Sequence, residues 1–336
     1  MVGRHARRDV SEGPVVHGVV LEGTGGVWRV RTDDGTTVDA SMRGRLKKSN
    51  SGRREDGSLR RDTVAAAAET PKLAVGDDVR LERGARDDAW AIAEILPRRS
   101  RLARRAPGGG QGERIVAANV DQVVVMLAAA RPDPHPRMLD RFLVIAEAND
   151  LAARIVINKI DLVGDASARE GFGAYERAGY QVHYISVKGG VGLDAVHAML
   201  AGRRSVVTGP SGVGKSSLLN TLFPGSGLRV RAISESVNKG RHTTVGALLL
   251  PLPHPDGGYV IDTPGLREIG LWSLEAIALD CCFPEIRLRR GGCRFGDCRH
   301  LAEPDCAVRD ALATGAITPE RYDSYRRMLE ELESSR

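Results

Sequence analysis

The stretch Gly209-Pro-Ser-Gly-Val-Gly-Lys-Ser-Ser217 decides the fold of this chain. An apolar run at residues 205–207 leads into it, and a helical pattern at residues 215–223 follows it. The spacing of its glycines, lysine and serine is that of the phosphate-binding P-loop, a turn between a strand and a helix. In such a turn, backbone N–H groups surround phosphate oxygens, and the helix N-terminus adds a favourable dipole. The sequence therefore predicts a site for a nucleoside triphosphate.

Each part of this loop has an expected contact with the triphosphate. Lys215 would reach the β- and γ-phosphates, and the Ser216 hydroxyl would ligate Mg²⁺. The residues that we expect to bind the nucleotide here are Gly209, Pro210, Ser211, Gly212, Val213, Gly214, Lys215, Ser216 and Ser217.

An α/β pattern surrounds the loop from residue 115 onward. The predicted strands are residues 120–127, 155–157, 184–186, 205–207, 247–252 and 259–261. The predicted helices between them are residues 138–148, 168–178, 193–200 and 215–223. Strands that alternate with helices indicate a parallel sheet with both faces covered. The ligand of such a sheet binds at the carboxyl ends of its strands, where the P-loop also lies.

Two short motifs that follow strands indicate guanine as the base. Asn158-Lys-Ile-Asp161 follows the predicted strand 155–157, and its last carboxylate can accept hydrogen bonds from guanine N1 and N2 together. Adenine offers no such pair of donors. Ser186-Val-Lys188 ends the next strand and could supply backbone donors to guanine O6. The residues assigned to the base are Asn158, Lys159, Asp161, Ser186, Val187 and Lys188.

Two further segments have the composition of nucleotide switches. In Asp262-Thr-Pro-Gly265, Asp262 would hold a Mg²⁺-bound water and the Gly265 N–H would meet the γ-phosphate. Lys239-Gly-Arg-His-Thr-Thr244 offers hydroxyls to the same Mg²⁺. Segments of this kind are ordered by the γ-phosphate and released on hydrolysis. Because the base motifs here precede the P-loop, the domain reads as a circularly permuted GTPase.

The residue that orients the attacking water is not obvious. Many GTPases place a Gln directly after the Asp-x-x-Gly motif, but this chain has Leu266 there, which cannot form a hydrogen bond. His242 is the nearest candidate, and contact with RNA or solvent is the alternative role for it. The candidate catalytic residues are His242, Lys215 and Asp262, and the candidate Mg²⁺ ligands are Ser216, Thr243, Thr244 and Asp262.

The first hundred residues read as a small antiparallel barrel. Predicted strands are residues 15–22, 27–31, 37–40, 79–82 and 90–96, separated by Gly and Asp-Gly turns. Five strands without helices favour an OB-fold. Residues 49–73 mix charges with an alanine run, and we expect most of this insertion to be disordered.

Two basic clusters flank the barrel and favour nucleic-acid binding, since phosphate contacts supply most sequence-independent affinity. A solvated surface and a linker are the alternative. The clusters are Arg43, Arg45, Lys47, Lys48, Arg53 and Arg54, and Arg98, Arg99, Arg101, Arg104 and Arg105.

All five cysteines lie beyond residue 280. The spacing Cys293-x4-Cys298-x-His300-x5-Cys306 offers three thiolates and one imidazole, the closed tetrahedral pattern of a structural Zn²⁺ site. Free buried thiols are the alternative. We interpret Cys281 and Cys282 as packing residues, and five arginines between residues 287 and 299 as a surface that faces a polyanion. Thr318 and Pro319 predict the start of the last helix.

Composition limits the class of protein. The 336 residues carry a net charge of +6, which permits a polyanionic partner, and 4% aromatic residues, which is few for a broad base-stacking surface. No apolar run reaches the length of a membrane span, and the basic N-terminus leads into no signal core, so we expect a cytoplasmic protein. We also expect it to be a monomer without a membrane partner. The expected organisation is a basic tail (1–12), a barrel (13–98), a linker (99–114), a GTPase domain (115–270) and a helical zinc domain (271–336).

The chain resembles the ribosome small subunit-dependent GTPase A family (RsgA, also called YjeQ). The marks of the resemblance are Ala117-Ala-Asn-Val-Asp-Gln122, the motifs at 158–161, 209–217, 240–244 and 262–265, and the four zinc-pattern residues. It implies a GTPase that binds the 30S subunit and its 16S rRNA late in assembly and is stimulated by that subunit. It also favours His242 as the residue that orients water.

Two departures from the family pattern stand out. The insertion at 49–73 is long, and Val245 replaces a third threonine, which leaves Thr243 or Thr244 as the Mg²⁺ ligand, with Thr244 preferred. The sequence also allows two other functions: a P-loop ATPase or small-molecule kinase with a zinc module, and a non-catalytic RNA-binding protein with a degenerate nucleotide site. The base motif argues against the first, and intact Lys215, Ser216 and Asp262 argue against the second.

Overall fold

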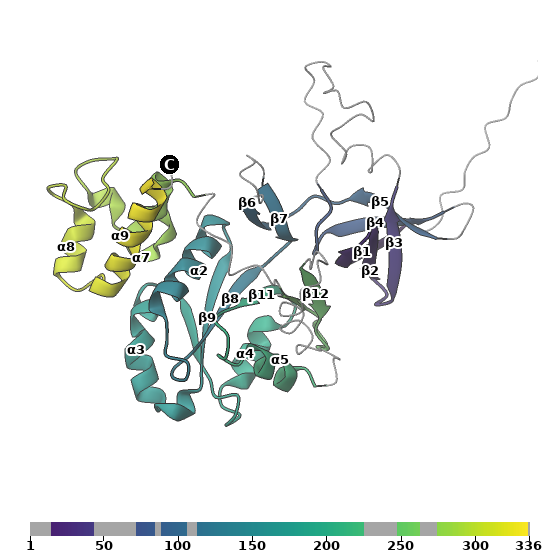
Figure 1. The fold of residues 1–336 in the computed structure, drawn as a ribbon, viewed down its shortest axis with the longest axis horizontal. Helices are drawn as coiled ribbons and strands as arrows, with labels where there is room; N and C mark the ends of the chain where they lie inside the picture. The colour runs from purple at the N-terminus through teal and green to yellow at the C-terminus, as the bar shows by residue number, and fades with distance from the viewer. Residues whose placement is uncertain are drawn as a thin grey trace, which may run out of the picture. The chain divides into compact units, whose positions relative to one another are not determined.

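The computed structural model describes residues 15–43, 72–84, 89–105, 113–224, 247–262 and 274–334. They belong to two compact units, Met1–Arg98 and Arg99–Arg336. The first unit is a closed barrel with the strand order β1-β2-β3-β5-β4 (Figure 1). Its strands are β1 (Val16–Thr24), β2 (Val27–Thr32), β3 (Thr37–Met42), β4 (Asp78–Arg83) and β5 (Trp90–Ile95). β3 and β5 pair in parallel and the other neighbours are antiparallel. The predicted OB-like barrel is confirmed.

The barrel core explains where the long insertion ends. Alternate side chains of the strands point inward, and Val20, Val30, Leu81 and Ile92 are fully buried. Leu73 packs into the same cluster at 8% exposure. The prediction that the disordered insertion extends to residue 73 is therefore wrong at its end, because a residue that closes the core belongs to the fold. Residues 49–71 lie outside the described ranges.

Arg98 corrects the interpretation of the second basic cluster. Its guanidinium donates two hydrogen bonds to the fully buried carboxylate of Asp77, from Nε at 2.6 Å and Nη2 at 2.8 Å. Asp77 Oδ2 also accepts the backbone N–H of Ala74 at 2.7 Å. A buried carboxylate needs such partners, so Arg98 holds the barrel together and is not available to a nucleic acid. In the first cluster, the described residue Arg43 pairs with Glu82.

The second unit contains a six-stranded sheet in the order β10-β9-β8-β11-β13-β12. Its strands are β8 (Gln122–Ala128), β9 (Ala152–Asn158), β10 (Gln181–Tyr184), β11 (Arg204–Thr208), β12 (Leu248–Pro251) and β13 (Tyr259–Asp262). The first five in this order run parallel, and the edge strand β12 is antiparallel to β13. The predicted parallel sheet is thus a mixed one, because an apolar run does not reveal the direction of its strand. The strand expected at 184–186 ends at Tyr184, and Ser186 forms an isolated bridge with Val191.

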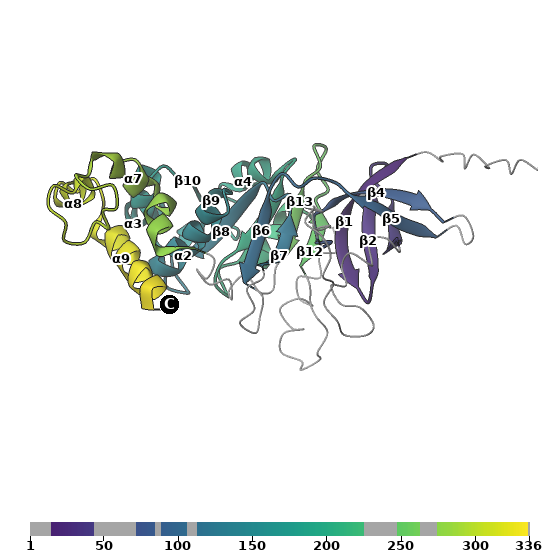
Figure 2. The same cartoon turned by 90° about the horizontal axis from the view of Figure 1, so that it is seen from above.

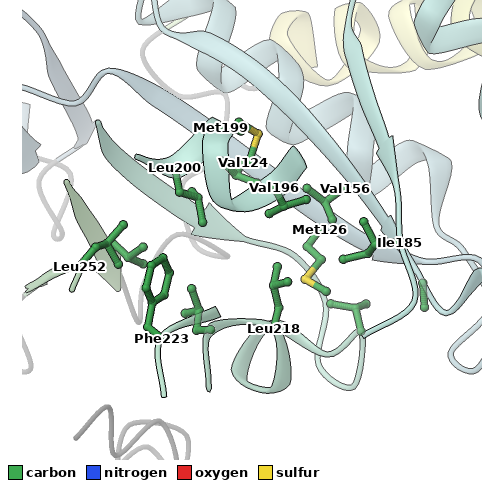
Figure 3. Packing of buried hydrophobic residues seen from close by; sticks show 14 residues of the cluster. Val124, Met126, Val156, Ile185, Val196, Met199, Leu200, Leu218, Phe223 and Leu252 are labelled. Carbon is green, nitrogen blue, oxygen red and sulfur yellow. The ribbon is translucent and has the colours of Figure 1, made fainter. Parts of the chain in front are cut away.

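Helices cover both faces of this sheet (Figure 1). They are α2 (Pro136–Ala148), α3 (Asp165–Arg177), α4 (Leu193–Leu200) and α5 (Lys215–Leu222), with a short η1 (Ile160–Leu162). On one face, α4 and α5 enclose a cluster that includes Met126, Val156, Leu218 and Phe223 (Figure 3). α2 packs against β8 and β9. The central strand β8 is buried along its whole length.

A two-stranded hairpin replaces part of the predicted linker 99–114. β6 (Arg101–Arg105) pairs with β7 (Glu113–Ala118), and Leu102 and Ala117 are fully buried. The backbone N–H of Ala103 reaches Asn149 at the end of α2, at 3.5 Å. The arginines of this segment obscure the apolar alternation that is typical of a strand. The charge of the segment therefore favoured a linker, whereas the structure has a strand pair.

The C-terminal region is helical, as predicted. It contains η3 (Ala276–Cys282), α7 (Pro284–Arg287), η4 (Arg290–Gly292), α8 (Ala307–Ala313) and α9 (Pro319–Ser334). Thr318 accepts the Arg321 N–H at 3.4 Å, which fits its predicted role as N-cap of α9. η3 and α9 pack against α2, and Figure 2 shows α9 beside α2. None of the described helices has both the length and the apolar character needed to cross a membrane.

A buried ionic cluster holds this region to the sheet domain. Arg321 of α9 donates to Asp140 of α2 at 2.5 Å and to Glu285 of α7 at 2.6 Å. Asp140 also accepts the hydroxyl of Tyr175 at 2.9 Å. All of these side chains are buried, and although burial alone would lower the pKa of Arg321, the two carboxylates raise it. Nearer the surface, Arg141 pairs with Glu331 through two hydrogen bonds.

Candidate functional site

The P-loop connects β11 to α5, as the sequence predicts. Gly209, Gly212 and Gly214 have φ values of +139°, +79° and +101°, a region that other residues rarely adopt. A Cβ atom on Gly209 would lie 2.0 Å from the carbonyl oxygen of Met126, and one on Gly214 would lie 2.4 Å from Asn158 Nδ2. The loop therefore needs glycine at both positions, for backbone conformation and for space.

Two side chains of this loop are placed for contact with an anion and a cation. Lys215 Nζ donates to the carbonyl oxygens of Gly209 and Pro210, at 2.8 Å and 2.6 Å. The ammonium group thus lies across the loop that would surround the phosphates. Ser216, in the first turn of α5, is exposed. Its hydroxyl is accessible to a metal ion that would accompany the phosphates.

Asn158 joins the two predicted halves of the nucleotide site. This buried residue ends β9, donates from Nδ2 to the Val213 carbonyl of the P-loop at 2.8 Å, and accepts the Val187 N–H at 3.0 Å. Lys159 adds a second link, because its Nζ donates to the carbonyl oxygens of Gly212, at 2.7 Å, and Arg131. The loop for the phosphates and the loop for the base are therefore held in one rigid arrangement.

Asp161 presents a carboxylate toward solvent at the same edge of the sheet. One of its oxygens accepts the Ser186 hydroxyl at 2.5 Å, and Ser186 Oγ in turn accepts the Gly189 N–H at 2.9 Å. Asp161 is exposed and Ser186 is buried. The buried hydroxyl orients the exposed carboxylate, which leaves its other oxygen open to donors on a ligand. Such a carboxylate suits the paired N–H donors of guanine.

Asp262 is the last residue of β13, the strand next to β11. The register pairs Val206 with Ile261, so the backbone of Asp262 lies beside the start of the P-loop. His242, Thr243, Thr244 and Gly265, the remaining predicted nucleotide and Mg²⁺ residues, lie outside the described ranges. The structure thus brings together the predicted base and phosphate residues, together with the strand that carries Asp262.

Some contacts at this site could not have been found from the sequence. The carbonyl groups of Arg131 and Val213 accept hydrogen bonds from Lys159 and Asn158, and the type of a residue does not reveal that its backbone is an acceptor.

Residues 121 and 122, within the 117–122 segment, contribute to the sheet rather than to the nucleotide site. Gln122 donates to the Met199 carbonyl and Ser205 hydroxyl, and Asp121 accepts the Arg204 N–H. These bonds join the beginnings of β8 and β11, at the end of the sheet opposite the P-loop.

The predicted zinc residues converge in the C-terminal region. The four ligand atoms of Cys293, Cys298, His300 and Cys306 lie within 4.8 Å of one another. The sulfur atoms of Cys293 and Cys306 are 3.9 Å apart, and His300 Nδ1 lies 3.6 Å and 3.4 Å from them. Zn–S bonds of about 2.3 Å and a Zn–N bond of about 2.0 Å in tetrahedral geometry imply S···S and S···N separations of about 3.8 Å and about 3.5 Å. The spacing fits a tetrahedral Zn²⁺.

The chemistry of these side chains also favours a cation. Burial, together with the thiols of Cys306 and Cys293, raises the pKa of Cys298 to about 12. A thiol crowded by other thiols resists ionisation, and a divalent cation reverses this preference by binding the thiolates. Cys282 is buried at the end of η3, as its predicted packing role requires, whereas Cys281 is half-buried.

The arginines of this region do not form the free basic surface that the sequence favours. Four of them are paired with carboxylates, and Arg289 donates to the Glu285 carbonyl oxygen. The pairs are Arg287–Glu147, Arg290–Asp280, Arg294–Asp305 and Arg299–Glu333. The interpretation as a polyanion-facing surface is therefore weakened by pairing within the molecule.

Comparisons with known proteins agree with this geometry. The model of the family described as RsgA GTPase matches residues 95–272. The chain is 56% identical over 316 residues to a protein of Gemmatimonas aurantiaca named small ribosomal subunit biogenesis GTPase RsgA, covering 94% of this chain and 97% of that protein. The crystal structure of YjeQ from Thermotoga maritima has a TM-score of 0.74 and 30% identity, with 96% of this chain and all of that chain covered.

YloQ, described as a circularly permuted GTPase, has a TM-score of 0.69 and 27% identity, and the match covers 98% of this chain and 99% of that chain. Both matches span nearly the whole of this chain, so its fold is similar to theirs. The match of the family model to more than half of the chain and the identity to the Gemmatimonas protein lead to one conclusion: this chain belongs to the RsgA GTPase family.

Proposed function

We propose that this protein hydrolyses GTP to GDP and phosphate, that it binds the 30S ribosomal subunit, and that the subunit stimulates its turnover during late maturation. The observation that carries the proposal is the position of Asn158, which bonds to the P-loop and to the loop of Ser186 and Val187 at once. A site built in this way binds a base and a phosphate chain as one ligand. The name of the Gemmatimonas relative supports the ribosomal part of the proposal.

The base of the nucleotide is bound by the residues around β9 and β10. Asp161 accepts hydrogen bonds from guanine N1 and N2, and Ser186 holds that carboxylate in place. The backbone N–H groups of residues 186–188 donate to guanine O6. Asn158 and Lys159 position these groups rather than select the base. Adenine lacks the paired donors, so ATP is a poor substrate.

The phosphates are bound by the loop of residues 209–217. Its backbone amides surround the phosphate oxygens, and Lys215 exchanges its bonds to the Gly209 and Pro210 carbonyl oxygens for the β- and γ-phosphates. Ser216, Asp262 and either Thr243 or Thr244 hold Mg²⁺, directly or through water. When bound, Mg²⁺ neutralises charge that develops on the phosphates.

Hydrolysis requires a water molecule in line with the γ-phosphate. Its oxygen forms a bond to phosphorus as the bond to the β-phosphate oxygen breaks, and GDP leaves. His242 orients this water, since Leu266 occupies the position of the usual glutamine and has no hydrogen-bonding group. Because His242 lies in a switch segment, turnover is slow until a partner orders that segment.

The other two regions serve recognition and structure. The N-terminal barrel contacts 16S rRNA, with the basic residues that are not used inside the fold as phosphate contacts. The C-terminal module holds one structural Zn²⁺ through Cys293, Cys298, His300 and Cys306, whose spacing matches tetrahedral coordination.

Phosphate release from GTP and ATP, each with and without 30S subunits, tests this function. The expected result is slow release from GTP alone, faster release with 30S, and little release from ATP. The variant Lys215→Ala is the control for contaminating hydrolases. Equal release from both nucleotides would support an ATPase or kinase instead, and no release with 30S would indicate a non-catalytic RNA-binding protein.

A further inference from the structure

His300 uses its two ring nitrogens in different directions. Nδ1 faces the sulfur atoms of Cys293 and Cys306, at 3.6 Å and 3.4 Å. Nε2 faces away from the cluster, toward Asp280 Oδ2 at 3.6 Å. The side chain is 1% exposed, and within the described part of the chain Nε2 has no hydrogen-bond partner. Bulk water therefore does not reach this nitrogen.

Asp280 has hydrogen-bond acceptor capacity that the described residues do not use. It lies on η3, its side chain is 8% exposed, and its Oδ1 has no hydrogen-bond partner among the residues that the structure describes. Oδ2, the oxygen nearer to the imidazole, accepts from Arg290 Nε at 3.0 Å. A carboxylate oxygen can accept more than one hydrogen bond, so Oδ2 retains capacity for the imidazole N–H. A movement of roughly half an ångström would bring Nε2 and Oδ2 to the usual hydrogen-bond distance of about 3.0 Å.

The chemistry of a histidine ligand accounts for this pairing. A neutral imidazole that gives Nδ1 to a metal carries its proton on Nε2. A buried N–H without an acceptor is unfavourable, and a carboxylate acceptor both fixes the ring and raises its basicity toward the metal. We propose that Asp280 is a positioning residue for the metal centre. Its carboxylate accepts a hydrogen bond from the Nε2–H of His300 and thereby holds Nδ1 toward the thiolates. This inference rests on the zinc binding proposed above.

Arg290 decides between this role and a simpler one. Asp280 could serve only as the ion-pair partner of Arg290, whose Nη1 also contacts Cys281 Sγ at 2.5 Å. Removal of Arg290 would then affect the module as much as removal of Asp280. If Asp280 acts on the metal through His300, the loss of Arg290 leaves the acceptor in place and changes zinc affinity little.

The position of Asp280 on η3 would connect the metal centre to the elements that pack against η3. η3 packs against α2 of the sheet domain and against α9. The four ligands lie within fourteen residues of one loop region, whereas Asp280 lies thirteen residues before the first of them. The hydrogen bond would therefore tie the metal centre to the element that contacts the GTPase domain.

Competition with a chromophoric chelator on the full-length protein tests the inference, with zinc alone as the probe. Asp280→Ala should weaken zinc binding about 10- to 100-fold. Asp280→Asn, whose amide oxygen can still accept the Nε2 proton, should lose less. Arg290→Met, the matched control, should lose less than about 3-fold. Equal zinc affinity of wild type and Asp280→Ala would overturn the inference, and so would equal losses in the Asp280→Ala and Arg290→Met variants.

A spectroscopic readout separates positioning from general loosening of the fold. In zinc-loaded wild type, ¹⁵N-labelled histidine should show His300 with Nδ1 bound to metal and an Nε2 proton protected from exchange with solvent. In Asp280→Ala, which has no acceptor, that proton should exchange faster, whereas Asp280→Asn, which keeps an acceptor and the side-chain volume, should retain most of the protection. Unchanged protection in Asp280→Ala would contradict the inference. Failure of the wild type to bind zinc would instead overturn the proposed metal site.

Discussion

Arg321 and Asp140, 181 residues apart in the chain, are joined by a 2.5 Å hydrogen bond inside the contact between α9 and α2. Arg321 is 3% exposed and also pairs with Glu285, so one cation faces two buried carboxylates. Removing one partner from such a cluster leaves uncompensated charge in the interior. This contact should therefore be sensitive to substitution.

We predict that Arg321→Met lowers the free energy of unfolding by about 3–5 kcal/mol, because Asp140 and Glu285 lose their counter-charge. Urea unfolding followed by circular dichroism measures the change. Arg141→Met is the matched control, since the Arg141–Glu331 pair spans the same two helices at 34% and 41% exposure. Its loss should be below about 1 kcal/mol. Similar losses in both variants would show that burial of the cluster is not what matters.

Asn158→Ala should weaken GTP and GDP binding to the same extent, by at least about 10-fold, since the half-buried Val187 N–H and the buried Val213 carbonyl lose their partner. Isothermal titration calorimetry with both nucleotides measures it. The exposed Asn220, in α5, provides a control for general effects of asparagine removal. A loss confined to GTP would place the role of Asn158 at the γ-phosphate and contradict this explanation.

Asp161→Asn should change the base preference from guanine toward xanthine. The amide would donate to the xanthine oxygen where the carboxylate accepted from the guanine amino group, and Ser186 remains to orient it. Competition binding with GTP and xanthosine triphosphate reveals the exchange. If GTP still binds more tightly than xanthosine triphosphate, Asp161 does not read the base.

Gly214→Ala should reduce nucleotide affinity at least about 10-fold, because the added Cβ would lie 2.4 Å from Asn158 Nδ2 at a φ of +101°. Gly212→Ala is the comparison. Its Cβ would have its nearest neighbour at 3.7 Å, so it tests backbone strain without the close contact. Equal losses in the two variants would assign the effect to strain alone.

His242→Ala should keep GTP affinity and lose most of the 30S-stimulated hydrolysis, because the substitution removes the group that we propose to orient water and leaves the proposed phosphate contacts intact. Single-turnover phosphate release with saturating 30S measures it. Lys215→Ala is the contrasting variant, in which affinity and turnover should fall together. Stimulated turnover at the wild-type rate would exclude His242 from the mechanism.

Local patterns predicted most of the sheet domain, the turn between β11 and α5, and the convergence of three cysteines with His300. The glycine spacing around Lys215 and the cysteine spacing around His300 are properties of short segments, and both matched the structure. Features that depend on distant partners were not predictable. The sequence favours Arg98 as a phosphate contact, whereas the structure pairs it with Asp77. Nothing in the residues around Arg321 or Asp140 indicates that these two side chains meet. The direction of β12 and the existence of β6 could not be predicted for the same reason, since pairing with a neighbouring strand decides both.

The order of the permuted domain has a mechanical consequence. The chain leaves the sheet at β13, a strand bonded on both sides to β11 and β12, and the C-terminal module is attached a second time through the packing of η3 and α9 on α2. Residues 263–273 thus connect two anchored points. Because the Arg321–Asp140 contact is part of this second attachment, separation of the module from α2 requires that buried cluster to break.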